Sequence, residues 1–373
     1  MSFAILFLFI TALLWFITYV GVNNGKQPKR ICTVIALSIL ILAIGTRYRI
    51  GGDFDTYWQT FSNLRLSEFG EDNRFSYEYG YWIVVDILRE TGFSPQSFFV
   101  VSSAITVILF GLLYKKRLFL LPSGIIVFML CFPFDFVING VRQGIAIFAF
   151  ILGITMIERS EKIRLGLLKF LVCIVIASLF HSTAIAYSII LPIIFGPISR
   201  LFNGKVLVAI AISGMILNMI GITDKILFET GMKEYALIFR YLDDDRFVLE
   251  KGKFGIGSFL TLLFYLIPLW YYDKITALYP KIKCFFIMMA FGLFVKYMLP
   301  GNMFANRVAY YLLFAEVLVI PYFFYYFKRK KKIYSYFVPV LFTLWYIVLF
   351  FFDLKEFIMN QIHPGATFLG ISV

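Results

Sequence analysis

Residues 139–157 read NGVRQGIAIFAFILGITMI, an apolar run long enough for a membrane helix that carries the cation Arg142 near its start. An arginine at the bilayer centre costs at least about 2.5 to 3.5 kcal/mol, so such a residue usually faces a protein interior or aqueous cavity and has an anionic partner. Arg142 stands only about 4.5 Å along the helix from Asn139, and it could also stay in water by snorkelling. Its polar neighbour Gln143 and two flanking glycines favour a position that faces a cavity.

The composition is that of a membrane protein. Hydrophobic residues make up 61% of the 373 residues and charged residues 15%, and mean hydropathy is +0.84, a balance that soluble domains of this length do not show. Twelve apolar runs approach the length that crosses a bilayer, and they begin near Phe3, Ile31, Ser97, Leu118, Asn139, Gly166, Ser182, Val206, Gly255, Cys284, Val308 and Ile333. The first run has no small-residue cleavage site, so we expect a retained helix. We expect an all-α polytopic membrane protein of about twelve transmembrane helices, forming one integral domain over residues 1–373.

Lysine and arginine gather in alternate connections between these runs. Nineteen basic residues, against three acidic ones, lie in six connections at 26–30, 115–117, 158–164, 200–205, 273–283 and 328–332. Cytoplasmic connections collect such residues. Both termini, the long loops 47–96 and 223–254 and the tail 353–373 are therefore predicted to be extracytoplasmic. The net charge of +13 then reflects topology, and nucleic acid is not needed as a partner to explain it.

The sequence carries no pattern typical of a bound cofactor. The four cysteines lie within or beside predicted helices, without a disulfide framework or metal-ligand spacing. A Walker loop and a Rossmann glycine pattern are both absent. Asp53 and Asp55 form a D-x-D pair that could hold a divalent cation through oxygen ligands, but two carboxylates alone make a poor metal site. We therefore expect neither a metal nor a cofactor.

Charged residues gather on the predicted outer side. Four arginines approach it, namely Arg47, Arg142, Arg240 and Arg307. Guanidinium groups suit the bidentate binding of phosphate or pyrophosphate. The paired glycines that follow Arg47 permit a tight turn, in which cations and carboxylates such as Asp53 could converge. Solvated charges in a loop beside the membrane are the alternative interpretation.

A second outer segment, residues 78–88, reads EYGYWIVVDIL and is too short to cross a bilayer. We expect an interfacial or re-entrant helix within the first long loop. Its aromatic residues and Tyr57 are membrane anchors by default, with stacking against sugar rings as the alternative. Tyr57, Asn139 and Gln143 are further polar residues that could bind a substrate.

The chain holds two histidines, of which His363 lies in the tail and His181 joins two apolar runs on the outer side. A lone membrane histidine is more often a structural hydrogen-bonding residue than a catalyst. If an imidazole performs acid–base chemistry here, His181 is the candidate. Asp53 and Glu78 are the alternative bases.

With these motifs in place, the sequence resembles the EpsG-like and Wzy-type polymerases of bacterial exopolysaccharide, capsule and O-antigen. The resemblance runs from the second predicted helix to the eleventh. It rests on Arg47-Tyr48 with Gly51, Asp53, Phe54 and Tyr57; on Glu78 and Gly80; on the stretch from Asn139 to Ala146; on Phe180-His181-Ser182; and on Asn306-Arg307 with Tyr310.

The resemblance implies a GT-C-like glycosyltransferase in the bacterial cytoplasmic membrane, with its site on the outer face. Its substrates would be oligosaccharide repeat units on undecaprenyl pyrophosphate, and a flippase and a chain-length regulator would be its partners. Such enzymes transfer the growing glycan to a sugar hydroxyl of the next lipid-linked unit. Arg142 and Arg307 would then clamp the pyrophosphate, Arg47 and Asp53 would organise the loop over it, and His181 would face the acceptor hydroxyl.

Other functions remain open from the residues alone. A flippase or transporter for lipid-linked oligosaccharide would also need arginines for pyrophosphate. Transporters often show internal repeats with broken helices, and no such repeat is visible here, while the unusual polar residues lie on one side. A glycan ligase, a membrane acyltransferase and a noncatalytic assembly partner are further alternatives. The sequence does not name the sugar or the linkage.

Overall fold

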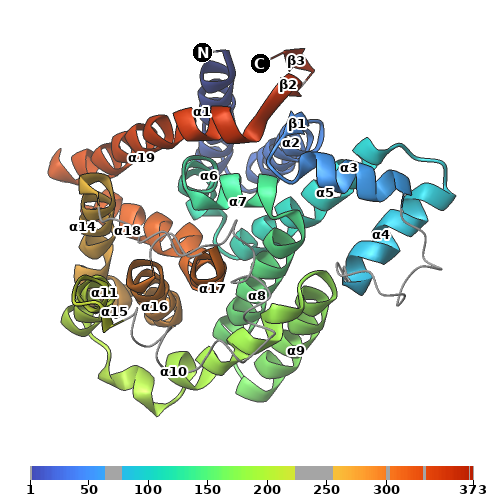
Figure 1. Ribbon diagram of the computed structural model, residues 1–373. Coiled ribbons are helices and arrows are strands. Elements are labelled where there is room, and N and C mark those ends of the chain that lie inside the picture. The colour runs from blue at the N-terminus through green and yellow to red at the C-terminus, as the bar shows by residue number, and fades with distance from the viewer. Residues whose placement is uncertain are drawn as a thin grey trace. The chain divides into compact units, whose positions relative to one another are not determined.

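The computed structural model describes residues 2–63, 78–222, 255–299, 303–330, 333–368 and 370–372. The described chain is mostly helical, as the sequence predicts (Figure 1). It comprises two compact units. Unit 1 contains Met1–Ala186 and Phe327–Val373, and unit 2 contains Tyr187–Tyr326.

Unit 1 is built around five helices that are long and apolar enough to cross a membrane. They are α1 (Ser2–Asn23), α2 (Lys26–Gly45), α5 (Pro95–Tyr114), α8 (Val141–Arg159) and α9 (Ile163–Phe180). In the most apolar 18-residue segment of each helix, 83% of the residues are buried in α8, against 22 to 50% in the other four helices. A helix that is apolar all round belongs in the core of a bundle. Helix α8, which carries Arg142, is therefore the central helix of unit 1.

Glycines set the close approach of α2 and α5. A Cβ atom at Gly45 would lie 2.8 Å from the Cα of Val100, and one at Gly111 would lie 2.6 Å from the side chain of Leu37. The end of α2 thus meets the start of α5, and the two helices run antiparallel.

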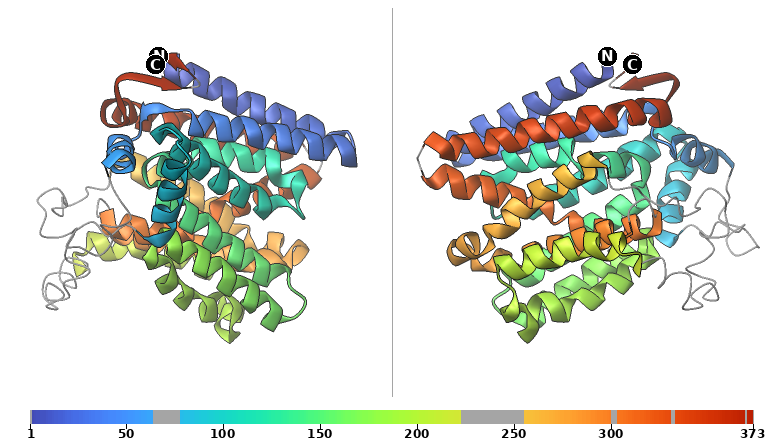
Figure 2. Two further views of the ribbon diagram at one scale, coloured as in Figure 1. Left: turned by 90° about the vertical axis from the view of Figure 1, so that its right-hand side faces the viewer. Right: turned by 60° about the vertical axis from the view of Figure 1, so that its left-hand side comes forward.

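Shorter helices complete unit 1. They are α3 (Phe54–Asn63), α4 (Tyr79–Glu90), α6 (Leu121–Leu130) and α7 (Phe132–Asn139), with the long α19 (Ile333–Gln361) at the other end of the chain. Helix α19 runs past α1 and α6 (Figure 2). Phe350 of α19 stacks on Phe7 of α1 with ring centroids 4.7 Å apart. Helix α4 confirms the predicted short helix after residue 78.

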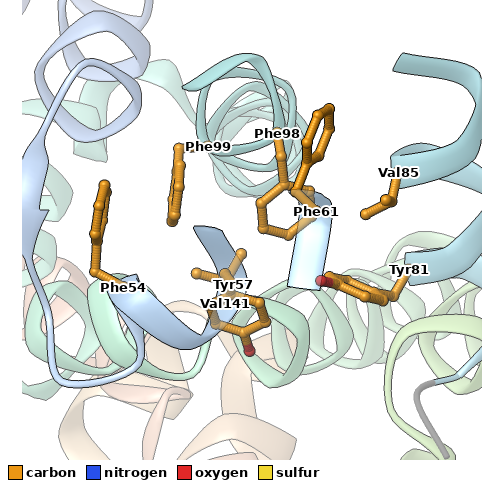
Figure 3. Close-up of a cluster of buried hydrophobic side chains, with 8 residues drawn as sticks. All are labelled: Phe54, Tyr57, Phe61, Tyr81, Val85, Phe98, Phe99 and Val141. Carbon is orange, nitrogen blue, oxygen red and sulfur yellow. The ribbon is translucent and has the colours of Figure 1, made fainter. Parts of the chain in front are cut away.

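An aromatic cluster joins four helices at one end of unit 1. It contains Phe54, Tyr57, Phe61, Tyr81, Val85, Phe98, Phe99 and Val141, contributed by α3, α4, α5 and α8 (Figure 3). Phe54 stacks on Phe99 with ring centroids 4.5 Å apart, and Tyr81 packs edge-on against Phe98 at 5.2 Å. Such aromatic pairs each contribute about 0.5–1.5 kcal/mol beyond the area they bury. The cluster therefore fixes α3 and α4 onto the long helices.

The same end carries a small antiparallel sheet that the sequence did not predict. Its strands are β1 (Tyr48–Ile50), β2 (Ile362–Phe368) and β3 (Ile371–Ser372), in the order β1-β2-β3. Tyr48 pairs with Thr367 and Ile50 with Ile362. The predicted tail, residues 353–373, is thus helical up to Gln361 and then forms strands. We call this end of unit 1 the sheet end; it comprises β1–β3, α3, α4 and the adjoining ends of α2, α5, α7, α8 and α9.

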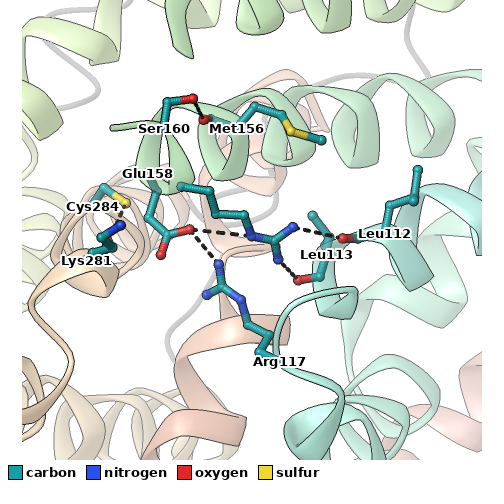
Figure 4. A network of polar contacts seen from close by, with 9 residues as sticks. Leu112, Leu113, Arg117, Met156, Glu158, Ser160, Lys281 and Cys284 are labelled. Carbon is teal, nitrogen blue, oxygen red and sulfur yellow. Dashed lines mark hydrogen bonds and ion pairs between the residues drawn. The ribbon is translucent and has the colours of Figure 1, made fainter. Parts of the chain in front are cut away.

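The opposite end of unit 1, here the basic end, gathers four of the lysine- and arginine-rich connections. Arg117 donates to Glu158 Oε2 at 2.5 Å, and both side chains are 5% exposed (Figure 4). Arg159 donates to the carbonyls at the end of α5. Lys328 lies 5.4 Å from the ring centroid of Tyr19, near the end of α1. Connections that were predicted to share one side of a membrane therefore share one end of unit 1.

In unit 2, too, the basic connections lie at one end of the helices. Its elements are the 3-10 helix η3 (Ser182–Ile190), which enters from unit 1, then α10 (Leu191–Phe195), η4 (Pro197–Leu201), α11 (Gly204–Met219), α14 (Ile256–Trp270), α15 (Tyr272–Leu278), η7 (Pro280–Ile282), α16 (Lys283–Met298), α17 (Met303–Leu313) and α18 (Glu316–Lys330), which returns to unit 1 from Phe327 on. The N–H of Gly204 donates to Asp273 Oδ2 at 3.0 Å, and Asn218 Nδ2 donates to Met298 O at 3.2 Å. Its two basic connections therefore lie at one end of α11.

Length and composition define the candidate membrane crossings in the described residues. Five helices qualify alone, and two pairs bent by 42° and 41°, α14 with α15 and residues 306–313 with α18, raise the total to seven. Four shorter apolar helical segments are Leu118–Leu130, Ser182–Phe195, Gly204–Met219 and Ser335–Phe351. Every one of the twelve predicted runs falls on a helical segment. The all-α membrane class is thus confirmed, and the number of crossings stays a prediction.

Candidate functional site

Arg47 is buried where α2 meets β1, with 1% of its surface exposed. Its guanidinium donates to three backbone carbonyl oxygens, those of Ile44 at 2.6 Å, Ile138 at 3.1 Å and Ile50 at 3.2 Å. Burial lowers the pKa of Arg47 to about 9, an effect that Tyr57 opposes, so the group remains a cation at neutral pH. Arg47 thereby fastens α2, β1 and the end of α7 together.

The loop after β1 rests on the end of α7. The N–H of Gly52 donates to Asn139 Oδ1 at 2.7 Å. Gly51 has a φ of 110°, and a Cβ atom there would lie 2.8 Å from the side chain of Ile138, so only glycine suits this position. Asn139 holds the loop three residues before Arg142, which places the paired glycines beside the start of α8.

Arg142 and Glu78 form an ion pair at the sheet end. Arg142 stands in the first turn of α8, Glu78 immediately precedes α4, and Arg142 Nη1 donates to Glu78 Oε2. The guanidinium carbon lies 5.6 Å from the ring centroid of Tyr81. The side chains of Arg142 and Glu78 are 23% and 17% exposed, respectively. Arg142 therefore has an anionic partner within the chain, in a place that water still reaches.

Glu78 also reaches the turn that contains His181. The N–H of Ser182 donates to Glu78 Oε1 at 3.2 Å. His181 directly follows α9, and its Nδ1 lies 2.6 Å from Thr183 Oγ1. One carboxylate thus contacts both the start of α8 and Ser182, and it brings the predicted residues Glu78 and Arg142 together beside the turn that contains His181.

A glycine permits this close approach of α4 and α9. A Cβ atom at Gly80 would lie 2.6 Å from the backbone oxygen of Leu179. Because a backbone atom cannot yield as a side chain does, Gly80 is required for Glu78 to reach Ser182.

Three other predicted residues belong to the sheet end of unit 1. Asp53 is exposed, and its backbone oxygen accepts the N–H of Tyr57 at 3.0 Å in the first turn of α3. Tyr57 is 5% exposed and belongs to the aromatic cluster, so its ring is not an open platform for a sugar. Gln143 is 4% exposed on α8.

The remaining predicted arginines lie elsewhere. Arg307 is on α17 in unit 2 and is partly exposed. Arg240 lies outside the described residues. Asp55 of the D-x-D pair lies 3.8 Å from Arg49. Among the described residues, no group of three or more histidine, cysteine, aspartate or glutamate side chains is arranged to hold a metal ion.

Sequence reasoning missed two features of the site. It singled out Glu78 as a base but did not connect it with Arg142, and it did not consider the backbone N–H of Ser182. The signal in the sequence was that Glu78 and Arg142 are both charged residues next to apolar segments and that both were predicted on the outer side of the membrane. Arg47 was predicted to bind pyrophosphate or to organise the loop, and its three bonds to carbonyls favour the second role.

Comparison with known proteins identifies the family. No curated protein and no solved structure matches the chain. The model of the EpsG family matches residues 29–364, a range that includes every predicted site residue from Arg47 to Arg307. The match confirms the resemblance that the motifs predicted. The chain belongs to the EpsG family.

Proposed function

We propose that this protein is a polysaccharide polymerase that uses lipid-linked repeat units at the outer face of the cytoplasmic membrane. Membership in the EpsG family supports a polymerase-like role in polysaccharide biosynthesis. The finer proposal is that a growing glycan moves from undecaprenyl pyrophosphate to a sugar hydroxyl of the next lipid-linked unit.

One observation carries this proposal: a partly exposed arginine at the end of a buried helix lies beside a histidine turn. Glu78 accepts from Arg142 and from the backbone N–H of Ser182, the residue that follows His181. A cation supports departure of an anionic leaving group, and an imidazole takes a proton near neutral pH. Both chemical roles are needed when a hydroxyl displaces a pyrophosphate.

The proposed step balances as follows. The acceptor hydroxyl gives its proton to His181 Nε2, and its oxygen bonds to the anomeric carbon of the donor glycan. The bond from that carbon to the phosphate oxygen breaks, and the lipid pyrophosphate leaves with the electron pair. In this proposal His181 Nδ1 donates to Thr183 Oγ1, 2.6 Å away, and Nε2 is the nitrogen that accepts the proton. Arg142 balances the charge that develops on the pyrophosphate.

Other residues have supporting roles in this proposal. Arg47 and Asn139 hold the loop beside α8 through their bonds to backbone groups. That Arg307 and Arg240 also bind the donor pyrophosphate remains a prediction from the sequence. Because the donor is already activated by its pyrophosphate, the reaction needs no nucleotide.

The distribution of basic residues supports the orientation. Lys and Arg collect in cytoplasmic connections, and four of these connections meet at the basic end of unit 1. The sheet end then faces outward. We propose that the twelve predicted runs all cross the membrane, as in a GT-C-like enzyme.

The test is reconstitution of the purified protein with a lipid-linked repeat unit, with and without a chelator, scored for a ladder of polymer. Arg142→Gln should lower the initial rate by about 10²–10³-fold, the effect of losing one charge-stabilising donor. His181→Gln should lower it by about 10²–10⁴-fold. Arg164→Gln changes an exposed arginine at the basic end and should leave the ladder intact. Transfer of lipid across vesicles without any ladder would instead indicate a flippase.

A further inference from the structure

The carboxylate of Glu78 sits where an anionic ligand of Arg142 would sit. Its Oε2 accepts from the guanidinium of Arg142, and its Oε1 accepts from the backbone N–H of Ser182 at 3.2 Å. Two donors from different helices thus converge on two oxygens of one anion. A phosphate group presents oxygens to such donors in the same way.

We propose that Glu78 is an internal stand-in for one phosphate group of the donor, and that the donor displaces it. The anion subsite then consists of the Arg142 guanidinium and the Ser182 N–H, next to His181. This inference rests on the proposed function, because it takes the donor to be a pyrophosphate. It changes the role of Glu78 from a base to a positioning residue that occupies the site until substrate arrives.

Charge and exposure support the exchange. The Glu78 and Arg142 side chains are 17% and 23% exposed, so a solute can reach the pair. A carboxylate carries one negative charge, whereas a pyrophosphate diester carries two and offers more acceptor oxygens. The same two donors therefore hold the diester more strongly than the carboxylate. The competition also keeps Arg142 from holding unrelated monoanions.

Displacement has a second consequence at His181. When Glu78 leaves, the N–H of Ser182 exchanges a carboxylate oxygen for a phosphate oxygen. The donor is then bound directly to the residue that follows His181, within reach of the imidazole. Binding of the pyrophosphate would thus hold the donor beside the residue that deprotonates the acceptor hydroxyl.

The first test measures the affinity of the full-length protein in detergent for inorganic pyrophosphate by calorimetry. Glu78→Gln removes the competing charge and should lower Kd by about tenfold. Glu90→Gln, the control, removes an exposed carboxylate at the other end of α4 and should leave Kd unchanged. An unchanged or higher Kd for a folded Glu78→Gln protein would overturn the proposal.

The second test needs no substitution. Saturating pyrophosphate should change hydrogen exchange in the parent protein at the Ser182 amide, since that amide changes its acceptor, while the amides of α6 should stay as they are. An unaltered Ser182 amide in the pyrophosphate-bound protein would also overturn the stand-in role. If the parent protein forms the polymer ladder but the two tests give the contrary results, only this inference is disproved. If the parent protein neither forms a ladder nor binds pyrophosphate, the proposed function is rejected.

Discussion

Replacement of Arg47 by methionine should loosen the loop beside the candidate site. The Arg47 guanidinium donates to three carbonyl oxygens at 2.6, 3.1 and 3.2 Å, and each hydrogen bond to a charged group contributes about 1.5–3 kcal/mol. Methionine also removes the desolvation cost of a buried cation, which amounts to several kcal/mol. We therefore expect a net loss of about 2–4 kcal/mol in the free energy of local opening.

Hydrogen exchange of the peptide that covers residues 44–54 measures this opening in the detergent-solubilised protein. The expected loss corresponds to exchange that is about 30- to 1,000-fold faster. Arg49→Met in the same loop is the control, because the Arg49 side chain is 38% exposed and loses an ion pair with Asp55 at 3.8 Å and one bond to the carbonyl of Pro364. Exposed contacts of this kind contribute about 1 kcal/mol each, less than the three buried bonds of Arg47. If Arg47→Met exchanges no faster than Arg49→Met, the carbonyl bonds of Arg47 do not hold the loop.

Three further predictions concern other parts of unit 1. Glu158→Ala leaves two arginines at the basic end without their shared carboxylate and should destabilise the protein by about 3–5 kcal/mol, which thermal unfolding in detergent would reveal. Gly80→Ala places a Cβ atom 2.6 Å from the backbone of α9 and should abolish polymer formation, whereas Gly257→Ala, with nothing within 4 Å, should not; equal activity of the two variants would contradict the packing argument. Truncation after Gln361 removes β2 and β3 and should speed exchange at residues 48–50 without preventing membrane insertion; unchanged exchange there would mean that the sheet does not order the loop.

Local sequence pattern predicted the helices because hydrophobic runs of near-constant length report directly on burial in lipid. Each of the twelve runs accordingly falls on a helical segment. The short helix after Glu78 was predicted for the same reason, since its apolar stretch is too short to cross. The grouping of basic connections also followed from the sequence, because it depends on charge and alternation alone.

Long-range partners were not predictable in this way. Sequence pattern indicated that Arg142 needs an anion, but Glu78 lies 64 residues away, and their meeting depends on how α4 packs on α9. Arg47 shows a related difficulty. Backbone carbonyls and a bound phosphate both satisfy a guanidinium, so composition cannot tell which of them a given arginine faces.

The pairing of β1 with β2 sets an order of events during synthesis. Arg49 donates to the carbonyl of Pro364 across 315 residues, and at about 5–20 residues per second the ribosome needs roughly 15 to 60 s to make that length. During this interval β1 lacks the strand it pairs with in the finished protein. The candidate site therefore reaches its final form only after residue 368 has emerged, so a chain still under synthesis is expected to sit in the membrane without acting on substrate.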